Sequence, residues 1–227
     1  MFYIDKEYSN REEIENFDCG HPLFNSYLKV GDHKEYDEDA NAVIHYILDV
    51  ENDALIGYFT LAAASITIFK LSEIINGEYI TIRGREIKLK TREIESVVIP
   101  DIEIKLKARD EPVIIPAIEL KMYAIDKKYQ GRMFDENTKL SVKILEAVYD
   151  ISKYYAWQYI GARMLTLYAI PKVVKMYESG GFKEMPVDSS MYTDMHQFNK
   201  GCVPMSKCLF EPIKITKVRQ TTEVIEI

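Results

Sequence analysis

Apolar and polar residues alternate along this chain in a way that predicts a β-sheet with one long helix against it. Two runs rich in β-branched and aromatic residues, 42–50 and 55–68, are separated by a short polar turn and predict an antiparallel hairpin. Over 135–157 the apolar residues recur every three or four positions, which predicts a helix with one buried face. Strands are expected before and after this helix, over 117–125 and 164–170.

Shorter elements are expected on both sides of this unit. The segment 18–22 (DCGHP) is typical of a turn before a short helix. Pro171 is expected to open another short helix, because its missing N–H costs little at the first helical position. Gly180 and Gly181 are expected to end that helix in a left-handed conformation. The other expected segments are an amphipathic helix over 23–28, a polar loop over 31–41 and closing strands over 182–185 and 203–209.

The region 69–115 has a different character from the rest of the chain. Residues alternate between apolar and polar on both sides of a glycine turn at 83–85, which predicts a half-exposed β-ribbon, and 102–107 repeats the alternation. We interpret 69–115 as a β-rich insertion within a single domain of residues 1–227, followed by a charged tail at 211–227. A structural ribbon, a dimer contact and a substrate lid are the three interpretations of the insertion.

Composition excludes some classes of function. The 227 residues are 47% hydrophobic and 29% charged, as expected for one globular domain. A net charge of −7 disfavours broad nucleic-acid binding. We expect no membrane span and no signal peptide, and the three cysteines, far from CxxC spacing, are expected to be reduced thiols in the cytoplasm. The four histidines lack paired ligand spacing, so no metal site is expected.

Three separated motifs, in this order, indicate a group-transfer enzyme. They are 17–20 (FDCG) with Leu23, Tyr27 and Leu28 after it, 57–65 (GYFTLAAAS), and 124–131 (AIDKKYQG) followed by 176–182 (MYESGGF). Together they resemble the GNAT superfamily of N-acetyltransferases. The first two resemble the branch that contains acetylating toxins of toxin–antitoxin pairs. The resemblance covers about 17–68 and 116–209.

The resemblance implies an α/β (α+β) fold, with a mixed, mostly antiparallel central sheet flanked by helices. It also implies transfer of an acetyl group from acetyl-coenzyme A to an amine. The acceptor is expected to be a small molecule or a protein amine, with aminoacyl-tRNA as the toxin-like alternative. A noncatalytic module that binds coenzyme A or another protein is a further alternative, and a homodimer is a possible assembly.

In this family the cofactor pyrophosphate lies where the fourth strand turns into a helix, because unpaired N–H groups and the helix dipole stabilise an anion there. The family pattern is Gln/Arg-x-x-Gly-x-Gly/Ala. Met133 and Asp135 stand where it has small residues, and Asp135 is expected to act instead as the helix N-cap. The cofactor-loop candidates are Gln130, Gly131, Arg132, Met133, Phe134 and Asp135.

Two residues are candidates for catalysis by resemblance. Tyr177 matches the position whose phenol protonates the leaving thiolate, with a plain core tyrosine as the alternative. Glu119 is a candidate general base, and period-two alternation is expected to place it on one strand face with Lys121 and Tyr123. An ion pair of Glu119 with a lysine across the sheet, and proton removal through ordered water, are the alternatives.

The pantetheine arm of the cofactor is expected to pair with a strand. In this fold the fourth and fifth strands splay apart, and the resemblance implies that the arm enters between them. The main chain of Met122, Tyr123 and Ala124 is expected to pair with it, close to Tyr168 and Ala169.

Overall fold

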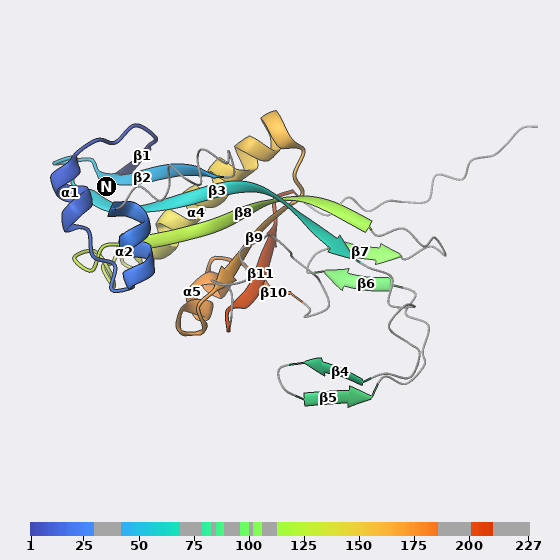
Figure 1. The fold of residues 1–227 in the computed structure, drawn as a ribbon. Helices are drawn as coiled ribbons and strands as arrows, with labels where there is room; N and C mark the ends of the chain where they lie inside the picture. Colours follow the sequence, from blue (N-terminus) through green and yellow to red (C-terminus); the bar gives the residue numbers. More distant parts are fainter. Residues whose placement is uncertain are drawn as a thin grey trace, which may run out of the picture.

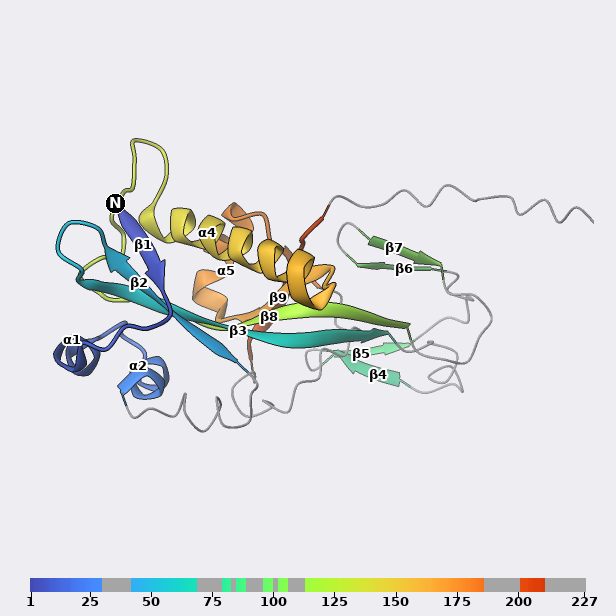
Figure 2. The ribbon, with the colours of Figure 1, turned by 90° about the horizontal axis from the view of Figure 1, so that it is seen from above.

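The computed structural model describes residues 1–29, 42–68, 113–185 and 201–210, together with the backbone of four short strands between residues 79 and 105 (Figure 1). A central sheet separates two layers of helices (Figure 2). Helices α1 (Arg11–Asn16) and α2 (Pro22–Lys29) cover one face, and α4 (Leu140–Tyr155) and α5 (Val174–Ser179) cover the other.

The central sheet contains seven strands in the order β1-β2-β3-β8-β9-β11-β10. Within this sheet β8 and β9 are parallel, and the other neighbours are antiparallel. A parallel pair needs a crossover, and α4 supplies it between β8 and β9. The predicted mixed, mostly antiparallel sheet is therefore confirmed. The strands are β1 (Phe2–Asp5), β2 (Val43–Asp49), β3 (Leu55–Ile68), β8 (Val113–Ile125), β9 (Met164–Ala169), β10 (Lys183–Glu184) and β11 (Val203–Cys208).

Two small hairpins occupy the region predicted as a β-rich insertion. Strand β4 (Tyr79–Ile82) pairs with β5 (Arg85–Lys88), and β6 (Ser96–Ile99) pairs with β7 (Ile102–Lys105). Each pair is a separate two-stranded antiparallel sheet. The alternating pattern therefore predicted β4, β5 and β7, whereas β6 was not predicted. Strand β8 begins at Val113, so the last three residues of the range 69–115 belong to the central sheet.

Each face of the sheet has its own hydrophobic core. The α4-side core contains residues of α4, of α5 and of the sheet, among them Phe59, Ile118, Leu120, Ile144, Val148, Leu165, Leu167 and Tyr177. The α1/α2-side core contains Phe17, Tyr27, Leu28, Tyr58, Met122 and Ala124, among others. Burial of these apolar side chains is the main force that holds both helix layers on the sheet.

The long helix is shorter than the sequence predicted. It begins at Leu140 rather than at residue 135, and its N-cap is Lys139, so the predicted N-cap role of Asp135 is wrong. The Asp135 carboxylate instead accepts the amides of Asn137 (2.9 Å) and Thr138 (2.7 Å) and stabilises a turn inside the preceding loop. After Tyr155 a π-helical turn, Ala156–Ile160, continues the helix.

Other differences are small. The predicted helix after Pro171 forms as a 3-10 turn, Pro171–Val173, that leads into α5. Of the two glycines after it, Gly181 is left-handed with φ 84° and Gly180 is not, at φ −81°. Strand β1 and helix α1 were not predicted. The loop predicted at 31–41 and the tail at 211–227 lie outside the described residues. In the described ranges, no helix combines the length and apolarity needed to cross a membrane.

Candidate active site

The central sheet opens between its two parallel strands. Residues Ala117–Leu120 of β8 pair with Met164–Leu167 of β9, and this register then ends. Strand β8 continues to Ile125 while it remains paired with β3 on its other edge. The main chain of β8 beyond Leu120 therefore faces a gap in the sheet on the β9 side. This is the splayed pair of strands that the resemblance implies.

A β-bulge lies on β8 at the place where the sheet opens. Thr60 of β3 is opposite Met122, and the next residue of β3 is opposite Leu120, so Lys121 is the extra residue. The bulge shifts the alternation of side chains. Leu120 and Tyr123 both pack against the α4-side core, while Met122 packs on the α1/α2 side.

The bulge corrects one prediction. Glu119 alternates with Ile118 and Leu120, which face the α4-side core, so Glu119 faces the opposite side of the sheet. The prediction that Glu119 and Tyr123 share a strand face is therefore wrong, because the extra residue at Lys121 reverses the parity of the positions that follow.

The main chain of β8 alternates between its two neighbours. The amide of Asp126 donates to β3 at Ile56 O (2.8 Å), and the amide of Met122 donates to Thr60 Oγ1 (3.1 Å). Residues two apart present their main chain to the same edge, so Met122 and Ala124 face β3. Of the three residues predicted to pair with the cofactor arm, Tyr123 is the one whose main chain faces the opening.

The two candidate catalytic residues lie on opposite faces of the sheet. Tyr177 is in α5, is 7% exposed and packs in the α4-side core, with its ring centroid 6.4 Å from that of Tyr123. Burial, with a smaller effect of Cys202, raises the pKa of the Tyr177 phenol. Glu119 is 3% exposed and lies between Ala62 and Thr166 in the last paired rows before the opening. A group that passed through the opening would therefore reach both faces.

The N-terminus of α4, where the family pattern predicts an anion site, is partly capped by its own loop. The amide of Leu140 donates to Arg132 O (2.9 Å), and the amide of Val142 donates to Lys139 O (3.0 Å). Two of the three first-turn amides are thus engaged by main-chain carbonyls. Tyr123 Oη also donates to Ser141 O at 2.6 Å, which fastens this end of the helix to β8.

The loop before α4 folds back on itself. Met133 and Lys139 form an isolated antiparallel bridge, and Thr138 O accepts the amides of Phe134 (2.8 Å) and Asp135 (3.4 Å). These are two of the amides that the family pattern would turn toward a pyrophosphate. The Asp135 carboxyl is exposed, and hydrogen bonds from the amides of Asn137 and Thr138 keep its pKa below its usual value.

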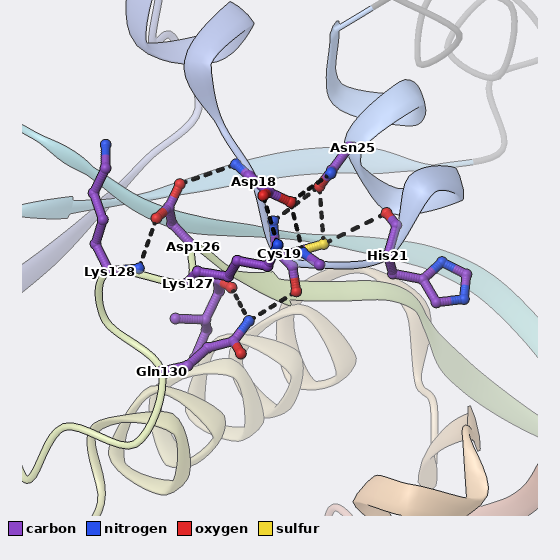
Figure 3. A network of polar contacts seen from close by, with 10 residues as sticks. Asp18, Cys19, His21, Asn25, Asp126, Lys127, Lys128 and Gln130 are labelled. Atoms are coloured by element: carbon purple, nitrogen blue, oxygen red, sulfur yellow. Dashed lines mark hydrogen bonds and ion pairs between the residues drawn. The ribbon is translucent and has the colours of Figure 1, made fainter.

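The beginning of the loop is held by a polar network that joins it to the connection between α1 and α2 (Figure 3). Gln130 Nε2 donates to Cys19 O and to Ile125 O, both at 2.8 Å. Lys127 Nζ forms an ion pair with Asp18 at 2.7 Å. The Arg132 guanidinium stacks 4.5 Å from the centre of the Tyr129 ring. The network had no signal in local sequence patterns, because its partners are more than one hundred residues apart.

One cavity of about 270 Å³ is present near this network, and its lining is acidic. Glu12, Glu13 and Asp126 contribute carboxylates to it, with Lys128 as the cation. Repulsion between carboxylates and phosphates makes it a poor site for coenzyme A.

Neither a protein-family model nor a curated protein matches this sequence. Solved structures do match. A Tyr-to-Phe variant of the AtaT toxin, bound to the C-terminus of the antitoxin AtaR and acetyl-CoA, is 14% identical, with 92% of each chain covered and a TM-score of 0.52. The KacTA–DNA complex is 16% identical, with 92% of this chain and 94% of that chain covered and a TM-score of 0.54.

A third similar structure is AtaT complexed with acetyl-methionyl-tRNAfMet. It is 15% identical, with 90% of this chain and 94% of that chain covered and a TM-score of 0.52. At these identities the likeness establishes the fold. The fold is that of these toxin structures, and the predicted resemblance is confirmed at the level of the fold.

Proposed function

We propose that this protein is an N-acetyltransferase that transfers an acetyl group from acetyl-coenzyme A to an amine. The observation that carries the proposal is the opening between β8 and β9, with the main chain of Tyr123 along one edge and Tyr177 packed beside it. An opening at a single parallel pair suits an extended arm that completes the sheet through main-chain hydrogen bonds. Neighbouring toxin structures that contain acetyl-CoA support the same cosubstrate.

The described residues fit the pantetheine arm of the cosubstrate better than its pyrophosphate. The pantetheine arm would lie along Tyr123, with Tyr168 and Ala169 of β9 on the other side. The pyrophosphate would lie over 130–135. Gly131 in this loop has φ +75°, and no atom lies within 4 Å of the position that a Cβ would take. Side-chain charge from Arg132 would assist there, because the amides of Phe134 and Asp135 are engaged by Thr138.

Acetyl-coenzyme A supplies a thioester whose carbonyl carbon accepts the amine and whose sulfur leaves. The amine must arrive neutral, and an N–C bond forms as the C–S bond breaks. The Tyr177 hydroxyl donates a proton toward the leaving sulfur. Because burial raises the pKa of this phenol, it stays protonated throughout the neutral range and is always available as a donor.

The amine loses one proton as the amide forms. Glu119 is the candidate acceptor of this proton, because it lies where the sheet opens and on the face opposite to Tyr177. Proton transfer through water is the alternative route. Replacement of Glu119 by Gln keeps the shape of the side chain and removes its basicity. We expect this variant to flatten the acidic limb of the pH–rate profile, and an unchanged profile would assign the step to water.

Aminoacyl-tRNA is the acceptor that we propose. The support is the structural likeness to AtaT complexed with acetyl-methionyl-tRNAfMet. A net charge of −7 opposes nonspecific binding of RNA, so recognition would depend on local contacts. Amines of small molecules or proteins are the competing acceptors, and a screen that includes all three classes decides between them.

The test uses the full chain with acetyl-CoA labelled in the acetyl group. Wild-type protein and Tyr177→Phe are incubated with charged tRNAs, with free amines and with proteins, and acetylated product is counted. Loss of a positioned acid lowers rates by about 10²-fold or more, so Tyr177→Phe should lose most of its turnover and keep its affinity for acetyl-CoA. Equal rates for both proteins would exclude Tyr177 as the acid.

A noncatalytic module is the second candidate function, and the capped N-terminus of α4 favours it. If Leu140, Val142, Phe134 and Asp135 keep their amides engaged, the anion site stays weak. Titration calorimetry with acetyl-CoA distinguishes the two functions. Binding without turnover of any acceptor would support a binding module, and no binding at millimolar concentration would exclude acetyl-CoA as the ligand.

A further inference from the structure

The connection between α1 and α2, residues 17–21, is joined by hydrogen bonds to the segment 126–130 that leads into the cofactor loop (Figure 3). We propose that Asp18 is a positioning residue for the proposed acetyl-coenzyme A site: it fixes 126–130 against this connection and so sets where the loop lies above the β8–β9 opening. This inference rests on the proposed function.

The carboxylate of Asp18 joins three parts of the chain. One oxygen accepts Lys127 Nζ at 2.7 Å, from the segment that follows β8. The other accepts Asn25 Nδ2 from α2 and the amide of Gly20 within the connection, both at 2.8 Å. Asn25 Oδ1 in turn accepts the amide of Cys19 at 2.9 Å. The orientation of the carboxylate is therefore fixed from three sides.

Main-chain bonds reinforce the same junction. The amide of Lys127 donates to Asp18 O (2.8 Å), and the amide of Asp18 donates to Asp126 Oδ2 (3.0 Å). Asp126 Oδ1 accepts the amide of Lys128 at 2.8 Å, and the Asp126 side chain is 3% exposed. Asp126 and Asp18 therefore both hold the first turn of the loop, through separate hydrogen bonds.

Gln130 completes the junction. Its Nε2 has two protons, and both are used by carbonyls on opposite sides, Cys19 O of the connection and Ile125 O of β8. The glutamine that matches the first position of the family pattern thus links β8 to the connection between α1 and α2. Its side chain would bind no phosphate through Nε2 in this arrangement, and it supports the loop from inside.

The close approach explains a glycine in the connection. Gly20 has φ +83°, a conformation that other residues rarely adopt, and a Cβ built on it would lie 2.9 Å from Cε of Lys127. The stem of Lys127 therefore lies across the open side of Gly20 on its way to Asp18. The backbone conformation favours glycine at this position, and a Cβ there would push the Lys127 side chain away from its place beside Asp18.

The ion pair itself adds little to stability, so its role in this proposal is to fix the position of the segment 126–130. The side chains of Lys127 and Asp18 are 58% and 49% exposed, and surface ion pairs of this kind contribute little to stability. Hydrogen bonds from Lys127 and Asn25 hold the pKa of Asp18 well below its usual value, so the carboxylate stays charged at any pH used for assays. A misplacement of about 1 Å at a binding group, by contrast, can cost orders of magnitude in rate.

The experiment compares two ligands of which one lacks the pyrophosphate and the phosphorylated adenosine attached to it. Titration calorimetry measures the binding of acetyl-CoA and of S-acetylpantetheine, which has the arm and the thioester but no pyrophosphate, to the full chain. We expect Asp18→Ala to weaken acetyl-CoA binding about tenfold and to leave S-acetylpantetheine binding unchanged. If Lys127 acts only as the partner of Asp18, Lys127→Ala should weaken acetyl-CoA binding as much as Asp18→Ala does. A larger loss would show that Lys127 also contacts phosphate.

Matched variants separate position from stability. Asp18→Asn keeps an oxygen for Asn25 and Gly20 and loses the ion pair, so its affinity for acetyl-CoA should lie between wild type and Asp18→Ala. Tyr3→Phe removes a comparably exposed hydrogen bond, to Asp53 at 2.9 Å, and should change neither ligand's affinity. Unfolding temperatures of all variants are measured alongside the titrations.

Three outcomes overturn the inference, and they differ from one another. Equal weakening of both ligands together with a lower unfolding temperature would make Asp18 a stability residue. Unchanged acetyl-CoA binding in Asp18→Ala would remove its positioning role while the proposed function stands. Failure of the wild-type protein to bind either ligand at millimolar concentration would refute the proposed function and the inference together.

Discussion

The β8–β9 opening and the N-terminus of α4 are the two halves of the proposed cofactor site, and they differ in how closely they keep to the pattern of the fold. At the opening, a bulge at Lys121 and the end of the register at Leu120 free one edge of β8. At the helix, Leu140 and Val142 already donate to carbonyls of the loop. The arm-binding half is thus ready, whereas the phosphate-binding half would compete with the loop's own hydrogen bonds.

This difference follows from where each half takes its hydrogen bonds. The edge of β8 is fixed from behind by β3 over the whole length of the strand, so its free groups are left pointing into the opening. The loop has no such support over 133–139, and it satisfies its polar groups locally through Thr138 and Asp135. The main-chain groups of the loop therefore pair with one another rather than with a neighbouring strand.

The largest expected effect comes from moving β3 away from β8. Gly57 lies opposite Ile125, and a Cβ on it would overlap the carbonyl oxygen of Ala124 and lie 3.1 Å from Ile125 Cα. These are backbone atoms that cannot give way. We expect Gly57→Ala to lower the free energy of unfolding by at least about 3 kcal/mol in urea denaturation.

Gly131→Ala is the matched control on the loop side. Gly131 has φ +75° but nothing within 4 Å of the added Cβ, so its cost is limited to backbone strain of about 1–2 kcal/mol. If the two variants lost equal stability, the opening would not be the more rigid half of the site, and the contrast drawn above would be wrong.

The sequence predicted most strands of the central sheet and the long helix well, because their patterns are local, and the resemblance implied the mixed sheet. Strands β2, β3 and β9 and the apolar stripe of α4 all lie close to their predicted ranges. The bulge at Lys121 was not predictable, because it depends on the register between two strands sixty residues apart. The Asp18–Lys127 pair was missed for the same reason. Residues 135–139 were predicted as helix and belong to the loop, because apolar periodicity does not define where a helix begins.

A second prediction concerns the other end of α4. His45 of β2 is 1% exposed, stacks on Phe59 and bonds through Nε2 to Tyr155 Oη at 3.0 Å, which ties the end of the helix to the sheet. Burial, together with the charge of Lys6, lowers the pKa of His45 to about 4. The native state therefore favours the neutral imidazole.

The sign of the pH effect follows from this shift. Above about pH 6.5 the unfolded histidine is neutral too, so the titration of His45 does not change the free energy of unfolding there. As the pH falls from 6.5 toward 4 the unfolded state binds the proton first, so the free energy of unfolding should fall by up to about 3 kcal/mol. Urea denaturation of wild type and His45→Gln across this range isolates the effect, since other groups titrate in both proteins. Parallel curves would contradict the assignment.

The pH experiment also sharpens the comparison between the halves of the site. Asp18 stays charged over the same range, because hydrogen bonds from Lys127 and Asn25 lower its pKa. Between pH 5 and 6.5 the free energy of unfolding should fall because the unfolded state binds the proton, while native His45 stays neutral and the loop junction stays intact. Acetyl-CoA affinity measured over this interval should therefore change little. A loss of affinity in step with stability would mean that His45 is already protonated in the native state in this range.

The smallest expected effect tests whether the loop's own turn competes with a phosphate. Asp135→Ala removes the acceptor for the amides of Asn137 and Thr138, so the turn should loosen and release the amides of Phe134 and residue 135. We expect the affinity for coenzyme A, measured by titration calorimetry, to rise about fivefold, because a ligand would no longer have to break the turn that Asp135 stabilises.

Asp135→Asn separates the turn from the charge. Its amide oxygen can still accept both N–H groups, so the loop should stay closed while the negative charge near the phosphates is removed. If the turn is the obstacle, Asp135→Asn should bind coenzyme A with nearly the wild-type affinity and Asp135→Ala should bind it more tightly. Equal gains in the two variants would show that the carboxylate acts by repulsion alone, and the N-terminus of α4 would then be as ready for a ligand as the β8–β9 opening.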